Sequence, residues 1–273
     1  SKGMNIANLL PLAQDEKISS MIRVPEFDET SFLVMVTKNG VIKRTELSAY
    51  DTARKGGVIA LSLDEGDELA WVRLTNGSSE LVVATKKGMA IRFSELDVRP
   101  MGRTARGVKA ITLSEGDCVV GMSTVRPDAL LLTVSETGYG RLSPLSDYRV
   151  QSRGGKGLLN YHVEKYGDVA AIKIVDLTDD VLLISSDGIL IRIPADSIRV
   201  CARPSKGVRV MRVTEGNRVV TLVRTSHEED EATDELPEDD NAQPDLTDEE
   251  LEADRRIDEA SDEASDETSD ETS

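Results

Sequence analysis

Few of the residues that carry chemistry in enzymes occur in this sequence. Histidine occurs twice, as His162 and His227, and cysteine twice, as Cys118 and Cys201. Neither histidine belongs to a cluster with metal-ligand spacing, and no loop of the Walker type that binds ATP phosphates is present. Two unpatterned cysteines predict small buried side chains in a reducing compartment, not a disulfide framework. We therefore expect no catalytic, metal or ATP site.

Long apolar runs and aromatic residues are also scarce. No stretch approaches the roughly 18 apolar residues that cross a bilayer, and no charged-then-apolar signal opens the chain. Aromatic residues make up 3% of the sequence, and Trp71, Tyr50 and Tyr148 are expected to pack in or beside the core. This scarcity argues against a surface on which single-stranded bases stack. Because the first residue is Ser1, we expect a parent protein that continues upstream.

Charge is divided between two unlike segments. Residues 227–273 hold 23 Asp and Glu against two Arg, a net of −21, which leaves 27 acidic and 31 basic residues in 1–226, a net of +4. The acidic segment has almost no apolar side chains and ends in four copies of Asp-Glu-(Ala/Thr)-Ser. Such a composition cannot offset chain entropy and predicts a disordered tail. Residues 1–226 are rich in Val, Ile and Leu and predict a folded, mildly basic domain.

An internal repeat of about fifty residues is the strongest signal in residues 1–226. Three sets of glycines keep this period almost unchanged, and each set marks a different turn. Each glycine of the first set precedes Val or Leu, and each of the second follows Asn, Lys, Thr or Asp. Those of the third lie in Glu-Gly-Asp twice, in Tyr-Gly-Asp once and in Glu-Gly-Asn once. The sets are Gly57, Gly107, Gly157 and Gly207; Gly40, Gly88, Gly138 and Gly188; and Gly66, Gly116, Gly167 and Gly216.

Between these glycines, short β-branched segments predict four strands in each repeat and no long helix. The first two strands flank the second set of glycines, which predicts a β-hairpin. The predicted first strands are 32–37, 81–85, 130–135 and 181–185, and the second are 41–45, 89–93, 139–142 and 189–193. The predicted third strands are 58–63, 108–113, 158–162 and 208–213, and the fourth are 69–74, 119–124, 169–175 and 219–223.

Four-stranded units at this period predict an all-β, propeller-like assembly in which neighbouring blades bury each other's faces. We expect one domain over residues 1–226, with a half blade at about 1–24 and blades at about 25–79, 80–128, 129–179 and 180–226. The acidic tail follows at 227–273. The half blade is inferred because Lys2-Gly3 matches Lys156-Gly157.

Positive charge recurs at one phase of the repeat, around the glycines of the first set. Equivalent loops of stacked blades lie side by side, so these cations are expected to form a curved basic rim. Basic loops are commonly only solvated, but recurrence at one phase favours a partner with regular charge, such as the duplex DNA backbone. The candidate DNA-binding residues are Arg54, Lys55, Arg103, Arg106, Lys109, Gln151, Ser152, Arg153, Gly154, Gly155, Lys156, Gly157, Arg203, Lys206 and Arg209.

Residues 151–157, Gln-Ser-Arg-Gly-Gly-Lys-Gly, carry a specific resemblance. They match six of seven positions of the gyrase-A box, Gln-Arg-Arg-Gly-Gly-Lys-Gly, with Ser152 in place of an arginine. The preceding Leu-Ser-Asp-Tyr, residues 8–12, the Glu-Gly-Asp turns and the acidic tail resemble the same domain. Over residues 1–226 the sequence resembles the C-terminal domain of the DNA gyrase A subunit. We call residues 151–157 the box segment.

The resemblance implies a β-pinwheel whose outer rim binds, bends and wraps duplex DNA. In the box segment, Arg153 and Lys156 would supply charge, Gln151 a hydrogen bond, and the glycines a close approach of backbone to phosphate. The principal box of the family belongs to the first blade, so this one is expected to be a secondary copy.

For the whole enzyme the resemblance implies an ATP-hydrolysing type II topoisomerase that introduces negative supercoils in the bacterial cytoplasm, at the nucleoid. Its implied cofactors are ATP and Mg²⁺, with no cofactor in this segment, which lacks the cleaving tyrosine. The implied partners are the upstream breakage–reunion domain and the gyrase B subunit in a heterotetramer, and no membrane. Two alternatives stay open: the matching domain of the topoisomerase IV A subunit, and a propeller that binds protein through a disc face.

Overall fold

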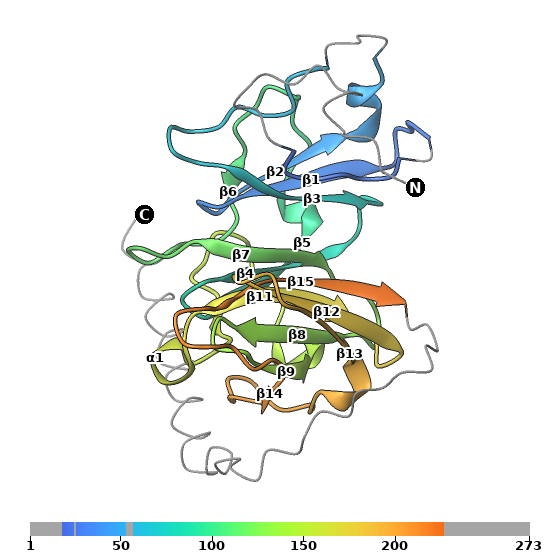
Figure 1. The fold of residues 1–273 in the computed structure, drawn as a ribbon. Helices are drawn as coiled ribbons and strands as arrows, with labels where there is room; N and C mark the ends of the chain where they lie inside the picture. The colour runs from blue at the N-terminus through green and yellow to red at the C-terminus, as the bar shows by residue number, and fades with distance from the viewer. Residues whose placement is uncertain (1–17, 25, 53–56, 227–273) are drawn as a thin grey trace.

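A computed structural model describes residues 18–24, 26–52 and 57–226. In them the chain forms four antiparallel sheets, blades 1 to 4, which follow one another in chain order (Figure 1). Blade 1 has the order β3 (Leu69–Thr75), β1 (Phe32–Thr37), β2 (Val41–Glu46), β6 (Val108–Lys109), and blade 2 the order β7 (Val119–Thr124), β4 (Glu80–Thr85), β5 (Met89–Ser94), β10 (Leu158–Leu159). Blade 3 has the order β11 (Val169–Val175), β8 (Leu130–Ser135), β9 (Tyr139–Pro144), β14 (Val208–Arg209), and blade 4 the order β15 (Val219–Ser226), β12 (Asp179–Ser185), β13 (Leu190–Pro194).

The predicted all-β, propeller-like fold is confirmed, and so are the hairpins of the first two strands. β1 pairs with β2, β4 with β5, β8 with β9 and β12 with β13, each across a turn that holds a glycine with positive φ. Short 3-10 turns follow the second strands, at Leu47–Tyr50, Glu95–Asp97, Leu145–Asp147 and Ala195–Ser197. The α-helical turn α1 (Val163–Tyr166) lies in the third repeat.

The third strands differ from the prediction in length and in the sheet to which they belong. Each of β6, β10 and β14 has two residues, and each pairs with the second strand of the preceding blade. The chain crosses to that blade directly after the 3-10 turn, where Pro100, Val150 and Val200 form parallel bridges to Arg44, Arg92 and Leu142. The second, third and fourth repeats therefore each complete the outer edge of the sheet before them. The predicted strand at 58–63 does not form.

The glycines that mark the repeat allow this crossing. A Cβ atom on Gly107 would lie 2.5 Å from the Ile42 carbonyl oxygen, and one on Gly157 would lie 2.5 Å from that of Ala90. Both glycines also have positive φ, +109° and +81°, which residues with side chains rarely adopt. These glycines thus recur every fifty residues because each repeat contacts the preceding blade at this position.

Apolar side chains fill the spaces between blades, so the inner blades are covered on both faces. In β4, Leu81 and Val83 pack against blade 1, whereas Val82 and Ala84 pack against blade 3. β8 repeats this alternation between blades 2 and 4. The fourth strands are neighbours, since β3 contacts β7, β7 contacts β11 and β11 contacts β15. They form the inner edge of the stack, and β6, β10 and β14 lie at the opposite, outer edge.

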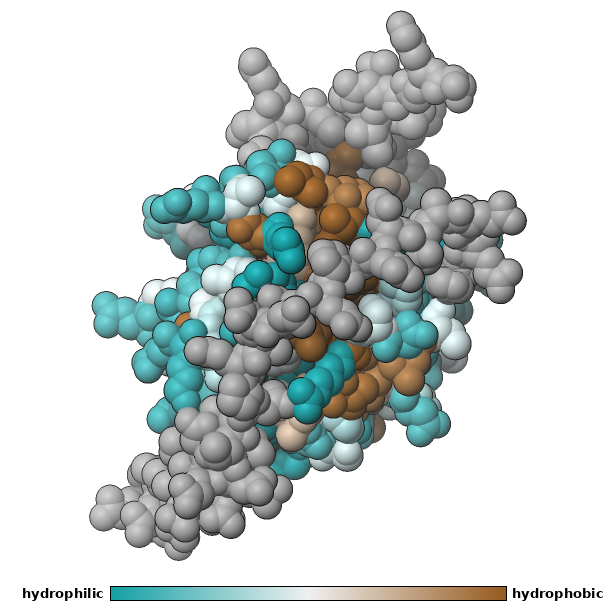
Figure 2. All heavy atoms as spheres, turned by 60° about the horizontal axis from the view of Figure 1, so that its bottom comes forward, coloured by the Kyte–Doolittle hydropathy of each residue, from teal (hydrophilic) through white to brown (hydrophobic). Residues whose placement is uncertain are grey.

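Blade 4 lacks the covering that the other blades receive. In the described part of the chain no strand pairs with the outer edge of β13, and Ile189 and Leu190 are 47% and 56% exposed. A Cβ on Gly188 would meet nothing within 4 Å, whereas one on Gly88 would lie 2.1 Å from the Tyr161 carbonyl oxygen. Figure 2 brings forward the end of the molecule that holds β13 and β14, and apolar side chains gather on this face.

Two predicted features fall mainly or wholly outside the described residues. Of the half blade predicted at about 1–24, only residues 18–24 are described, and they contain no strand. The acidic tail at 227–273 lies entirely outside them.

The contact at Gly157 generates a stability prediction. Gly157→Ala should lower the free energy of unfolding by about 2–4 kcal/mol, because the methyl group strains a positive φ and clashes with the backbone of blade 2. The matched control is Gly155→Ala, since a Cβ there would meet its nearest atom at 3.8 Å and φ is not positive. Urea unfolding of both variants measures the difference. Equal stabilities would contradict the packing role.

Candidate nucleic-acid interface

The predicted DNA-binding residues that the structure describes lie together at the outer edge of the stack. In the second, third and fourth repeats they occupy the loop that crosses to the preceding blade, except that Lys109 and Arg209 lie in the short strands β6 and β14 that end it. The structure describes Arg103, Arg106 and Lys109 in the second repeat, the box segment in the third, and Arg203, Lys206 and Arg209 in the fourth. Arg54 and Lys55 lie outside the described residues.

The crossing loops of successive repeats contact each other, which makes this edge continuous. The Gly154 amide donates to the Ala110 carbonyl oxygen at 2.7 Å, and the Thr112 amide donates to that of Gly155 at 2.8 Å. The Tyr161 hydroxyl in turn donates to the Lys206 carbonyl oxygen at 3.0 Å. These bonds join the loops of the second, third and fourth repeats in order. Their cations therefore follow one edge and are not scattered over separate surfaces.

Arg153 and Arg203 have a structural task that the sequence does not reveal. Arg153 donates from Nε to the Asp97 carbonyl oxygen at 2.9 Å and from Nη1 to that of Lys109 at 3.1 Å. Arg203 makes the equivalent bonds to Asp147 and Leu159, both at 2.8 Å. Two of the five N–H donors of each guanidinium thus bind a loop to the preceding repeat. The positive charge stays at the edge, but its position is set by the protein backbone.

The residues of the box segment divide between structure and surface. Gly157 packs against blade 2, whereas Gly154 has φ +87° and a distance of 3.6 Å from its Cβ position to the nearest atom. Ser152, Gly155 and Lys156 are exposed. The Gln151 amide N–H donates to the Arg92 carbonyl oxygen at 2.8 Å. From the sequence, these glycines are expected to let the backbone approach a phosphate closely. In the structure, Gly157 lets the chain approach the protein backbone of blade 2 closely.

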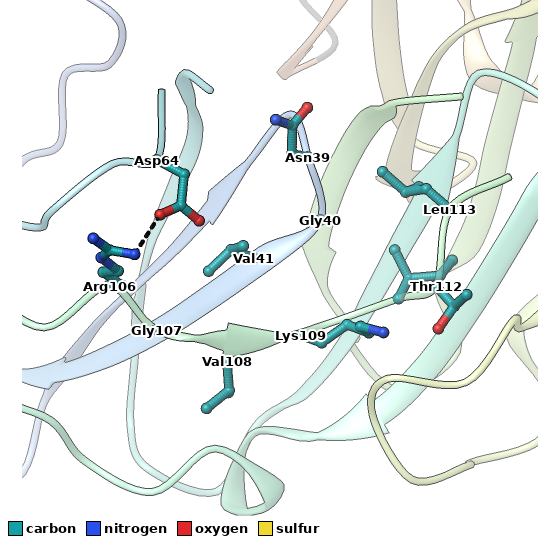
Figure 3. A pocket seen from close by; sticks show the side chains of 11 residues that line it. Asn39, Gly40, Val41, Asp64, Arg106, Gly107, Val108, Lys109, Thr112 and Leu113 are labelled. Atoms are coloured by element: carbon teal, nitrogen blue, oxygen red, sulfur yellow. Dashed lines mark ion pairs between the residues drawn. The ribbon is translucent and has the colours of Figure 1, made fainter. Parts of the chain in front are cut away.

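Exposed cations line a groove beside β6 (Figure 3). Asn39, Gly40 and Val41 form one side of it, and residues 106–109 and 111–113 form the other. The Arg106 side chain is 72% exposed and pairs with Asp64 at 2.9 Å. Lys109 is exposed two residues beyond Gly107. The groove therefore presents two exposed cations at the outer edge of blade 1: Lys109 on β6, and Arg106, which is ion-paired, in the loop before it.

In the fourth repeat the cations gather on Tyr139, a residue that sequence reasoning missed. The Lys206 Nζ lies 3.9 Å from the ring centroid, and Arg209 Nη2 donates to the Tyr139 hydroxyl at 2.6 Å. Burial acts to raise the pKa of Tyr139, but hydrogen bonds and charge from Arg209 and Lys206 outweigh it and lower the pKa. The ring fixes both cations beside β14. Its signal in the sequence is an aromatic residue directly after the turn glycine.

Two further cations are buried beneath the crossing loops. The Lys43 ammonium is fully buried and donates to the Ala60 carbonyl oxygen at 2.5 Å and to the Arg103 carbonyl oxygen. Arg141, at the same position of β9, is also fully buried and donates from Nε to the Ser205 carbonyl oxygen at 3.0 Å. Both bind the loop of the following repeat from below. Sequence reasoning missed them because their place in a hairpin strand resembles that of a solvated charge.

The aspartates of the Glu-Gly-Asp turns stabilise the fold. Asp67 Oδ1 accepts from the amides of Asn39 and Glu68, at 3.0 and 2.8 Å, and Asp117 repeats the pattern with Lys87 and Cys118. Within residues 18–24, 26–52 and 57–226 no group of three or more His, Cys, Asp or Glu is arranged to hold a metal ion. The described residues thus offer no donor set for the Mg²⁺ that the resemblance implies for the whole enzyme.

The other aromatic residues of interest belong to the core. Tyr148 is 1% exposed, and Trp71 packs against the apolar cluster between blades 1 and 2. His162 precedes α1, and its ring centroid lies 6.4 Å from that of Tyr166. The packing role predicted for Trp71 and Tyr148 is confirmed. Among the described residues, no helix has the length and apolar character to cross a membrane.

These observations define a class: a propeller-like β-repeat domain with exposed cations along a continuous outer edge. A family model described as "DNA gyrase C-terminal domain, beta-propeller" matches residues 31–76, 79–126, 129–176 and 179–226. The chain belongs to this family. The four matched units coincide with the four hairpins and the fourth strand that follows each of them.

Individual relatives agree with the family. The chain is 40% identical over 234 residues to the DNA gyrase A subunit of Staphylococcus epidermidis, covering 84% of this chain and 26% of that protein. It is 36% identical over 243 residues to the Mycolicibacterium smegmatis counterpart, covering 88% and 29%. The chain thus spans less than a third of the curated relatives that it matches.

Two solved structures resemble the fold closely. The C-terminal domain of DNA topoisomerase IV has a TM-score of 0.77 and 27% identity, covering 82% of this chain and 71% of that one. The DNA gyrase A C-terminal domain has a TM-score of 0.74 and 27% identity, covering 82% and 75%. The fold is therefore common to both kinds of topoisomerase.

The buried ammonium of Lys43 generates a pH prediction. Burial, with repulsion from Arg103, lowers the pKa of Lys43 from 10.5 to about 8. Between these pH values the unfolded chain binds a proton that the folded protein does not, so stability rises with pH. Relative to Lys43→Met, the unmodified protein should gain about 1 kcal/mol of unfolding free energy between pH 8 and pH 9. Urea unfolding at both pH values tests this, and an unchanged difference would contradict it.

Proposed function

We propose that this chain binds, bends and wraps duplex DNA along its outer edge, as the C-terminal domain of a DNA gyrase A subunit. The observation that carries the proposal is the recurrence of exposed cations on successive crossing loops that contact each other. Lys109, Lys156 and Arg209 are all exposed on this edge. A curved row of fixed cations suits a partner whose charge is regular along its length.

Bending the duplex sets the energetic requirement. Smooth bending of a 20–30 base-pair site costs about 1–6 kcal/mol. Contacts distributed along the edge must offset that cost, and they must not yield when the DNA pulls on them. The bonds from Arg153 and Arg203 to the preceding repeat support this role, since they hold the loops in place.

In the whole protein, the proposed role is to support ATP-dependent negative supercoiling by a bacterial type II topoisomerase. The breakage–reunion domain upstream and the gyrase B subunit in a heterotetramer would supply strand cleavage, ATP and Mg²⁺ chemistry. We place this activity in the bacterial cytoplasm, at the nucleoid.

The matching domain of the topoisomerase IV A subunit is the nearest alternative, and the TM-score of 0.77 favours it as a fold. The box segment and the named gyrase relatives favour gyrase. A protein-binding scaffold is the alternative of a different class, and it predicts no specific role for the outer cations.

Neutralising the edge should weaken DNA binding in a salt-dependent manner. The slope of log K against log salt is negative, and each lost phosphate contact reduces its magnitude by about 0.9. The variant Lys109→Gln with Lys156→Gln should therefore bind a 40-base-pair duplex more weakly, with a slope smaller by about 2. Fluorescence anisotropy at several salt concentrations measures both. The control is Lys38→Gln with Lys87→Gln, which removes equal charge at hairpin turns and should leave the slope unchanged.

Wrapping is tested separately from binding. Nicked plasmid should be sealed by ligase in the presence of increasing amounts of the protein, and then freed of protein. If DNA follows a curved edge of fixed hand, the linking number should shift in one direction as protein is added. A protein that binds without wrapping would leave the topoisomer distribution centred where it began, and the wrapping proposal would be wrong.

A further inference from the structure

A second set of cations recurs at the outer edge, and its members lie outside the loop positions considered so far. Arg99, Arg149 and Arg199 are fifty residues apart, and all three are exposed. We call them the junction arginines. Each directly follows a residue that is 1–2% exposed: Val98, Tyr148 and Ile198. In the first repeat the corresponding position, after Tyr50, is Asp51. The set therefore covers the three junctions between blades 1 and 4.

The backbone on both sides of each junction arginine is fixed. Before it, the amide of the buried residue donates back across the 3-10 turn, as from Val98 to the Glu95 carbonyl oxygen at 3.0 Å. After it, the chain bonds to the second strand of the preceding blade. Met101 donates to Arg44, Gln151 to Arg92 and Cys201 to Leu142, each at 2.8 Å. The three arginines thus start from equivalent, rigid points on three neighbouring blade junctions.

A side chain of the box segment holds the middle arginine. With its amide oriented to satisfy both of its ends, Gln151 accepts at its side-chain oxygen from Arg149 Nη2 at 3.0 Å and Nε at 3.1 Å. This bond engages one edge of the guanidinium. Gln151 thus acts on a neighbouring arginine, which gives it a role other than the direct contact to DNA expected from the sequence.

Exposed apolar residues accompany the arginines. Val150 and Val200 are 52% and 46% exposed, and Pro100 holds the same place at the first junction. A guanidinium beside a small apolar side chain matches the alternation of phosphate and deoxyribose along a DNA strand. Guanidinium groups also bind phosphate through paired N–H donors, which an ammonium group cannot do.

We propose that the junction arginines Arg99, Arg149 and Arg199 are phosphate contacts of the duplex, one at each blade junction, and that Gln151 positions Arg149 for this contact. The inference rests on the proposed function and deepens it by assigning the contacts. It gives the box segment two tasks: Arg153 secures its loop to the second repeat, and Gln151 orients the guanidinium beside it.

The test is the triple variant Arg99→Gln, Arg149→Gln, Arg199→Gln in the full 273-residue chain. Its affinity for a 40-base-pair duplex should fall by about tenfold or more. The magnitude of the slope of log K against log salt should fall by about 3. The matched control is Lys38→Gln, Lys87→Gln, Arg218→Gln, which removes the same charge at two hairpin turns and directly before β15, and should retain the slope. Circular dichroism melting confirms folding. If the triple variant does not fold, each single variant should lower the slope by about 1.

The role of Gln151 is tested by a double-mutant cycle. Gln151→Leu should weaken DNA binding about two- to fivefold, as expected for loss of a positioning hydrogen bond. In the Arg149→Gln background the same change should have no further effect. If Gln151→Leu weakens binding equally in both backgrounds, Gln151 does not act through Arg149.

The outcomes separate this inference from the proposed function. If the unmodified chain binds duplex with a steep salt dependence and the triple variant matches it, the junction arginines are not contacts, but DNA binding stands. If the unmodified chain fails to bind duplex even at low salt, the proposed function itself is wrong. A shallower salt dependence of binding in the triple variant, but not in its control, supports the inference.

Discussion

The structure depends on one exchange between neighbours: each repeat places a two-residue strand on the outer edge of the sheet before it. An unpaired sheet edge invites association with another chain, and this exchange removes it from three of the four blades. It also requires the chain to pass close to the backbone of the preceding blade, which only glycine permits at positions 107, 157 and 207. The period in the sequence and the covered outer edges of blades 1 to 3 therefore have the same cause.

The same exchange places the charge. Because the crossing loops cover the outer edge, their cations lie there, and hydrogen bonds to the next loop fix their spacing. Lys43 and Arg141 bind these loops from below through the carbonyl oxygens of Arg103 and Ser205. A buried cation is costly unless its donors are satisfied, and the loop carbonyls supply acceptors without neutralising the charge. The edge is consequently positive in its interior as well as on its surface.

Much of the fold was predictable because its signals are local. Alternating apolar residues and turn glycines identify the hairpins wherever they occur, so β1, β2, β4 and β5 match their predicted positions closely. The sheet that receives a third strand is not a local property, because it depends on the direction in which the chain leaves the 3-10 turn. Arg153 could be recognised as a cation at the right phase. Its bonds to carbonyls 56 and 44 residues earlier in the chain could not.

Rigid placement explains why an edge of this kind suits a bent duplex. A flexible basic loop would bind phosphate but would move with the DNA. The duplex would then straighten and release its bending free energy. Here pairing with the second strand of the preceding blade, the parallel bridge and the guanidinium–carbonyl bonds hold the loops of the third and fourth repeats at three places. The cost of ordering these loops is met during folding, before DNA arrives. Under the proposed function, the path of the DNA would then be set by the protein, and contacts repeated at each blade junction would share the free-energy cost of bending.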